Sequence, residues 1–160
     1  MKNEIRTYKG LITSLLSHQV FTFGSNPEGR HGAGAARVAA NNYGAIMGVG
    51  RGHMGQSYGL VTKNLTPNYT EDVSNITYVK AGERSVSKSQ LVVNIIELYL
   101  YARKNPDLEF MVAYTPAPNL NGYSPIEMVE LFLMVNVPDN IVLNDELMSI
   151  YYEHKTKTKK

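Results

Sequence analysis

The chain contains no cysteine, so it can form neither a disulfide nor a thiolate metal site, and it has no cysteine nucleophile. This absence is typical of proteins in a reducing compartment. No apolar run approaches the roughly 18 residues that a membrane span needs, and the N-terminal residues lack the apolar core of a signal peptide. Together these absences predict a soluble, cytoplasmic protein with no membrane partner.

Charge of either sign is also modest. Charged residues make up 19% of the chain and the formal net charge is +2, which is too small to indicate a nucleic-acid partner. Hydrophobic residues make up 43% of the 160 residues, which is enough to form a buried core without disulfide bonds or a structural metal. We expect a single domain over residues 1–154, followed by a disordered basic tail over 155–160. The oligomeric state is not predicted by any pattern in the sequence.

Predicted strands alternate with predicted helices along the chain. β-branched and aromatic runs predict strands at 20–23, 45–47, 58–62, 108–114 and 141–143. Apolar spacing and capping residues predict helices over 32–42, from Ser87 to about Ala102, from Ser124 to about Val135, and from Asn144 to about Glu153. Residues 5–17 are ambiguous and 64–85 are irregular. This order predicts an α/β fold, a three-layer α/β/α sandwich with a mostly parallel mixed sheet and strand 20–23 at its centre.

The predicted strand 20–23 leads into a glycine-rich loop over residues 24–36. Glycines let backbone N–H groups converge on a ligand, and the helix that follows adds its own free N–H groups. The alternative is a turn that only allows the strand and the helix to pack closely. The polar side chains of Ser25, Asn26, Arg30 and His31 favour a phosphate- or ribose-binding loop. Among them, His31 and Asn26 are the candidates for a catalytic role, and His31 could instead hydrogen-bond the loop.

Two other segments are rich in turn residues. Residues 113–123 join a predicted strand to a capped helix, where Tyr123 could stack on a ligand or pack beneath the loop. Residues 50–55 match the glycine spacing of a dinucleotide fingerprint, but a predicted strand follows them where that motif requires a helix. The four histidines show no metal-ligand spacing. We therefore predict neither a metal site nor a cofactor.

These segments, in this order, resemble the macrodomain superfamily, and most closely a macro-like group common in bacteriophages and prophages. The similarity covers most of residues 10–135. It rests on the FGSN turn at 23–26, the GRHGAGAA loop at 29–36, the segment 50–63 and the late turn at 119–123. The resemblance implies an ADP-ribose-like or other nucleotide-derived ligand. The ligand-binding residues it implies, together with those of the glycine loops, are Leu11, Gly24, Ser25, Asn26, Gly29, His31, Gly32, Ala33, Gly34, Ala35, Thr115, Asn119, Leu120, Asn121, Gly122 and Tyr123.

The chain departs from the macrodomain pattern at two places. Leu11 stands where macrodomains carry an aspartate that reads the adenine amino group, and leucine cannot accept that hydrogen bond. The late turn contains Pro116 and Pro118 in place of a run of glycines, so it offers fewer N–H donors. Both departures imply weaker or broader ligand selection than in other macrodomains.

Three functions follow from these observations. The first is a binding module that recognises, and could sequester, a nucleotide-derived signal. The second is a hydrolase of ADP-ribosyl or ADP-ribose-phosphate bonds. The third is a nucleic-acid-binding accessory protein that uses Arg30, Arg37, Arg51 and Lys63, which are few and match no known reader motif.

Overall fold

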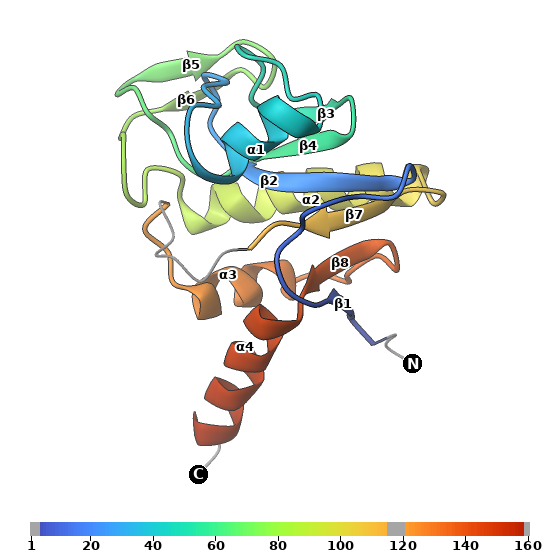
Figure 1. Cartoon of the computed structure of the whole chain (residues 1–160). Coiled ribbons are helices and arrows are strands. Elements are labelled where there is room, and N and C mark those ends of the chain that lie inside the picture. Colours follow the sequence, from blue (N-terminus) through green and yellow to red (C-terminus); the bar gives the residue numbers. More distant parts are fainter. Residues whose placement is uncertain (1–3, 115–120, 159–160) are drawn as a thin grey trace.

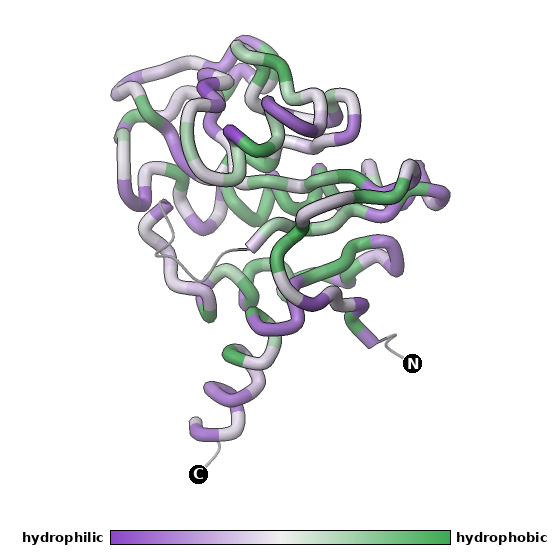
Figure 2. The backbone as a smooth tube through the Cα atoms, in the orientation of Figure 1, coloured by the Kyte–Doolittle hydropathy of each residue, from purple (hydrophilic) through white to green (hydrophobic). Residues whose placement is uncertain are grey.

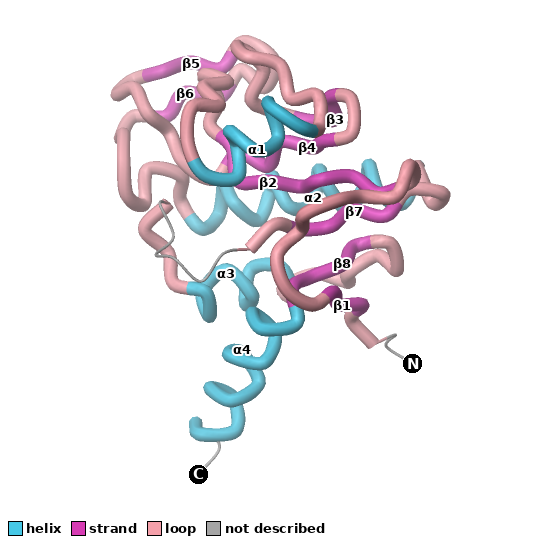
Figure 3. The backbone as a smooth tube through the Cα atoms, viewed as in Figure 1, coloured by secondary structure: helices cyan, strands magenta, loops and turns pink. Residues whose placement is uncertain are grey.

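A computed structural model describes residues 4–114 and 121–158 of the chain. In this part, six strands form one sheet in the order β1-β8-β7-β2-β4-β3, and only β3 runs antiparallel to its neighbour (Figures 1 and 3). A separate two-stranded hairpin pairs β5 with β6. The strands are β1 (Arg6–Tyr8), β2 (Gln19–Ser25), β3 (Gly52–Met54), β4 (Ser57–Val61), β5 (Tyr69–Glu71), β6 (Ile76–Tyr78), β7 (Glu109–Val112) and β8 (Ile141–Asn144).

Helices cover both faces of the sheet (Figure 1). Helix α1 (Gly34–Asn42) packs on one face together with Ile12 and Leu15. Helices α2 (Lys88–Lys104) and α3 (Pro125–Phe132), with the first turn of α4 (Asp145–Thr158), build the larger core on the other face. The predicted α/β class, with a mostly parallel mixed sheet between helical layers, is confirmed. None of the helices in the described ranges combines the length and apolarity that a bilayer crossing requires.

Strand β2 lies in the interior of the sheet, between β7 and β4, as predicted for residues 20–23. Its side chains alternate between the two cores: Phe21 and Phe23 pack against α1, whereas Val20 joins the core of α2 and α3. Because β2, β4 and β7 are parallel, their carboxyl ends meet at the same edge of the sheet. Ligands in open α/β sheets bind at such an edge.

Capping residues set the helix boundaries as the sequence indicates. The Ser87 hydroxyl accepts a hydrogen bond from the Gln90 N–H. Ser124 and Glu127 form a complete capping box, and Pro125 occupies the first helical position. At the last helix, Asn144 Oδ1 accepts a hydrogen bond from Leu147 N over 3.1 Å. These local contacts explain why three of the four predicted helix starts are correct within a residue.

Some predictions are wrong. Residues 45–47 are a loop, because Ala45 N donates to Ala39 O at the end of α1 and Ile46 O accepts from Val49 N in a turn. Residues 64–85 contain the β5–β6 hairpin rather than only irregular chain. Helix α4 continues through Thr158 where a frayed tail after His154 was expected, and its last turns are hydrophilic and exposed (Figure 2).

The hairpin is tied to the sheet by the buried guanidinium of Arg51. It lies 2.8 Å from a carboxylate oxygen of Glu71 and also donates to Asn94 and Tyr78. Both charged side chains of the Arg51–Glu71 pair are at least nine-tenths buried, at 7% and 5% exposed. A buried pair of this kind is costly to break, because the remaining charge is left without a partner.

Candidate functional site

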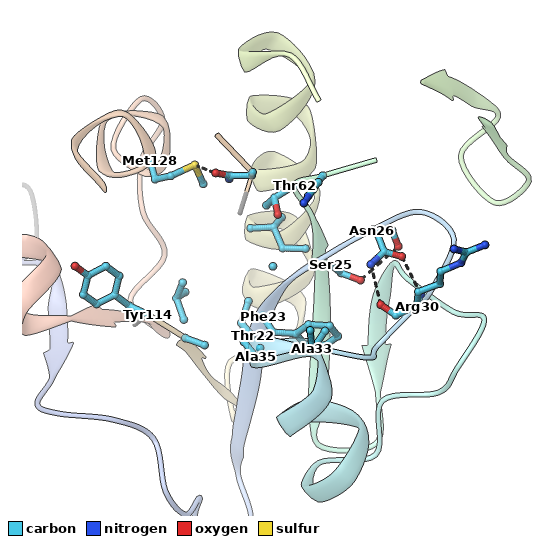
Figure 4. A pocket seen from close by; sticks show the side chains of 18 of the residues that line it. Thr22, Phe23, Ser25, Asn26, Arg30, Ala33, Ala35, Thr62, Tyr114 and Met128 are labelled. Atoms are coloured by element: carbon cyan, nitrogen blue, oxygen red, sulfur yellow. Dashed lines mark hydrogen bonds between the residues drawn. The ribbon is translucent and has the colours of Figure 1, made fainter. Parts of the chain in front are cut away.

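A cavity of about 580 Å³ opens at the carboxyl ends of β2, β4 and β7. Its volume is within the range of small-molecule sites, about 300–1,000 Å³. Strand β2 and the loop after it form one wall, the start of α1 a second, and α3 with the start of α4 a third (Figure 4). Many of the residues predicted to bind a ligand line it, namely Gly24, Ser25, Asn26, Gly32, Ala33, Gly34, Ala35 and Asn121.

The N-terminus of α1 faces the cavity without a side-chain cap. Its N-cap residue, Ala33, has an extended backbone and forms no capping hydrogen bond, and the first turn carries no acidic residue. The first N–H groups of a helix have no partner within the helix, and its dipole favours an anion there. Gly34 has a φ of +58°, and a Cβ built on it would meet no atom within 4 Å. The cavity therefore has open space directly in front of free backbone donors.

The same part of the cavity is positively charged. Arg30 and Lys63 line it, and neither forms an ion pair within the described ranges. The described lining contains no aspartate, glutamate or histidine. Such a surface suits the oxygens of a phosphate or pyrophosphate.

The opposite part of the cavity is apolar. Figure 4 shows Tyr114 and Met128 at the far side from Asn26 and Arg30, with Thr22 and Phe23 between them. Burial raises the pKa of the Tyr114 phenol, and the negative charge of Glu146 raises it further, so the hydroxyl stays protonated near neutral pH. Met128 is one of several apolar side chains of the cavity lining, which also include Leu60, Val112, Phe132 and Leu147. A ligand with a charged end and a less polar end would match the two parts.

Asn26 shapes the loop between β2 and α1. Its Nδ2 donates to Arg30 O and its Oδ1 accepts from Arg30 N, each over 2.8 Å. Ser25 is buried beside it and lines the cavity. Asn26 is therefore engaged in the loop backbone, which is a positioning contact rather than the free side chain that a catalytic role would need.

His31 does not line the cavity. Its Nε2 lies 3.0 Å from Ile46 O and 2.9 Å from Val49 O, which assigns the ring proton to Nε2 because both partners are acceptors. The ring is buried edge-on against Phe23. Of the two roles weighed for His31, the structure favours the hydrogen-bonded loop residue over the catalytic one.

Other predicted residues lie outside the cavity lining. Leu11 is 63% exposed. Gly29 packs against another loop, since a Cβ there would lie 2.3 Å from Gly48 C. Tyr123 is buried, donates its hydroxyl to Val86 O over 2.7 Å, and carries the Arg84 guanidinium over its ring, so it packs beneath the loop rather than stacking on a ligand. Gly122 has a φ of +85° in the same turn. Thr115, Asn119 and Leu120 lie outside the described residues.

Sequence reasoning did not find the floor and the apolar part of the cavity. The sequence pattern indicates only core positions in strands for Thr22, Leu60 and Val112. It likewise indicates only helix core for Phe132 and Leu147. Thr62 ends the predicted strand 58–62 and Lys63 follows it, so the rule that ligands bind at carboxyl ends could have identified them.

Comparison of the chain with protein-family models, with curated proteins and with solved structures finds no match. The site is therefore described by its own geometry. That geometry offers an anion end, an apolar end and a preshaped loop between them. It brings no acid, base or metal cluster together within the residues that the structure describes.

Proposed function

We propose that this cavity binds a nucleotide-derived ligand of the ADP-ribose class, and that the protein acts as a binding module rather than a hydrolase. The observation that carries the proposal is the uncapped N-terminus of α1, which opens onto the cavity. Beside it, the cavity lining includes Thr22, whose buried hydroxyl has no hydrogen-bond partner in the described part of the chain. The resemblance of residues 23–36 to macrodomain loops is a second support and suggests the ligand class.

The phosphates would occupy the end of the cavity that lies before α1. Backbone N–H groups of Gly34 and Ala35 are free to donate there, and Arg30 and Lys63 supply positive charge. Each of these contributions is modest, about 0.3–1 kcal/mol for an anion at a helix N-terminus, but they converge on one place. The less polar remainder of the ligand would extend towards Met128 and Phe132.

Hydrolysis would need a group that positions or activates water. No aspartate, glutamate or histidine is among the described lining residues, and residues 115–120 contain none in sequence. Asn26 already uses both polar atoms of its amide within the loop. His31 uses Nε2 there, and although its buried Nδ1 has no partner among the described residues, His31 does not line the cavity. These facts support binding without turnover, which is what a protein that sequesters a nucleotide signal would require.

A nucleic-acid-binding surface receives no support from the placement of the four basic residues. Arg51 is buried in its pair with Glu71, and Arg30 and Lys63 line the cavity. Arg37 is exposed on α1, so the four do not form a continuous basic face.

Thermal unfolding with ADP-ribose, ADP, ribose 5-phosphate and adenosine tests the proposal. A ligand at 100 times its dissociation constant stabilises the folded state by about 2.7 kcal/mol, or roughly 5–11 °C for a domain of this size. We expect ADP-ribose and ADP to raise the melting temperature and adenosine, which lacks phosphate, to raise it least. No shift with any phosphate-bearing probe, at concentrations up to the millimolar range, would refute the proposal.

Ala33→Asp locates the phosphate. Aspartate is a good N-cap, so the variant should stabilise the free protein by about 0.5–2 kcal/mol. The same carboxylate would repel a phosphate at the helix N-terminus, so binding of ADP-ribose should be lost. Ser87→Asp, which places the same charge at a helix start outside the cavity, is the matched control. Full binding by the Ala33→Asp protein would show that the phosphates do not lie before α1.

A further inference from the structure

Thr22 is a buried polar residue that the fold does not explain. It is 1% exposed, and its hydroxyl oxygen has no hydrogen-bond partner among the described residues. Its backbone carbonyl is used by the sheet, since Thr22 O accepts from Ala113 N over 2.8 Å. Leaving a buried hydroxyl unpaired is unfavourable, and valine would fill the same volume without that cost.

Thr22 is one of the residues that line the cavity. In the parallel register, Thr22 lies beside Val112 of β7. Because side chains of a strand alternate between its two faces, Thr22 is on the same face as Val20, which packs in the core that includes α3. The next residue on that face is Gly24, which has no side chain and whose built Cβ would lie 3.0 Å from Thr62 Oγ1. Space above Thr22 is thereby kept open between the anion end and the apolar end of the cavity (Figure 4).

We propose that the Thr22 hydroxyl is a specificity-determining group that hydrogen-bonds an uncharged polar group of the ligand. This inference rests on the proposed function, since it requires a ligand in the cavity. The partner is an uncharged group because a hydroxyl carries no charge, whereas Arg30 and Lys63 of the same lining can pair with a phosphate. A sugar hydroxyl and the polar edge of a base share this chemistry, because each can hydrogen-bond a hydroxyl that both donates and accepts.

Thr22→Val tests the inference, because it removes the hydroxyl and keeps the shape. Affinities of wild type, Thr22→Val and Thr22→Ser are measured by calorimetric titration with ADP-ribose, ADP and ribose 5-phosphate. We expect Thr22→Val to weaken ADP-ribose binding about fivefold, the equivalent of ~1 kcal/mol for one neutral hydrogen bond, and Thr22→Ser to bind within about twofold of wild type. A loss confined to ADP and ADP-ribose assigns the partner to the adenosine half, and a loss confined to ribose 5-phosphate and ADP-ribose assigns it to the terminal ribose.

The melting temperature of the free protein separates this role from a structural one. An unpaired hydroxyl replaced by a methyl group should leave the melting temperature equal or higher, whereas a hydroxyl that serves the fold would lower it. Thr70→Val, which removes a hydroxyl paired with Thr77 in the hairpin outside the cavity, is the control and should not change affinity. Wild-type binding with unchanged affinity in Thr22→Val overturns this inference alone. Failure of the wild type to bind any of the three probes overturns the proposed function and this inference with it.

Discussion

The side chain of Asn26 and the backbone of Arg30 form a closed pair of hydrogen bonds, each 2.8 Å long, in which the amide both donates and accepts. This pair fixes the turn between β2 and α1 before any ligand arrives. The backbone around it is equally constrained, since a Cβ at Gly50 would lie 1.8 Å from Asn26 O. A preshaped loop lowers the entropic cost of binding.

Replacement of Asn26 should therefore affect stability and affinity together. Asn26→Ala leaves the part-buried N–H and carbonyl of Arg30 without their side-chain partner, and we expect it to lower the free energy of unfolding by about 1–3 kcal/mol. Asn26→Asp should also destabilise, because its second oxygen would face Arg30 O. Chemical denaturation measures the free energy of unfolding of both variants. The control is Asn136→Ala at an exposed position, whose free energy of unfolding should stay within about 0.5 kcal/mol of wild type. Unchanged stability in both variants would mean that the pair does not hold the loop.

Gly34 is expected to serve the ligand more than the packing of the fold. Gly34→Val should abolish binding of ADP-ribose, because the side chain would enter the space in front of α1. It should also cost about 1–2 kcal/mol, since the φ of +58° is unfavourable for any residue with a Cβ. Gly82→Val has the same kind of strain at a φ of +85°, with no atom within 4 Å and outside the cavity lining.

Calorimetric titration distinguishes the two glycine variants. We expect Gly82→Val to be destabilised and still bind ADP-ribose with wild-type affinity. Equal affinity in Gly34→Val and wild type would return the loop to a packing role.

His31 should prove structural. His31→Ala removes the donor shared by Ile46 O and Val49 O and an aromatic contact with Phe23, so we expect a loss of about 1–3 kcal/mol in the free energy of unfolding. His154→Ala, exposed on α4, is the control. We also expect no release of ADP-ribose from an ADP-ribosylated protein or nucleic acid by the wild type. Release that disappears in His31→Ala, in a protein that remains folded, would instead identify a hydrolase.

Glu127 at the start of α3 should make the stability of the folded protein depend on pH in the acidic range. Hydrogen bonding to the Ser124 backbone, then to Lys88 and Arg84, lowers the pKa of Glu127 from 4.5 to about 2. A carboxyl group with a lowered pKa in the folded state stabilises it above the unfolded pKa, and this contribution is lost as the pH falls through the folded value. Wild type should therefore melt higher than Glu127→Gln at pH 6–7, and the difference should shrink between about pH 4.5 and 2. Glu130→Gln, an exposed residue of the same helix with no ion pair in the described ranges, should show no such trend. A difference between wild type and Glu127→Gln that does not change with pH would disprove this explanation.

Local patterns were sufficient for much of the fold. The apolar run at 20–23 predicted an interior strand, and Ser87, Ser124 and Asn144 predicted the starts of three helices, because capping depends on contacts within four residues. The glycine-rich run at 32–35 also lines the cavity, and its proposed role towards a phosphate stays a prediction. The predicted strand 45–47 is wrong because Ala45 N donates to Ala39 O of α1 and Ile46 O accepts from Val49 N, so these residues bond a helix end and a turn rather than a neighbouring strand.

The sequence by itself determined the α/β order, the capped helices and a glycine loop suited to phosphate, all of which depend on short-range backbone chemistry. Only the tertiary structure decided which polar residues are available to a ligand. Arg30 and Arg51 are both arginines of glycine-rich segments, yet long-range partners bury Arg51 away from the cavity while Arg30 lines it. In sequence Thr22 is an ordinary strand residue. In the fold, parallel pairing with β7 places it in the cavity lining, with a buried hydroxyl that has no partner among the described residues. Burial and pairing of this kind are properties of the packed chain, because each depends on residues far away in sequence.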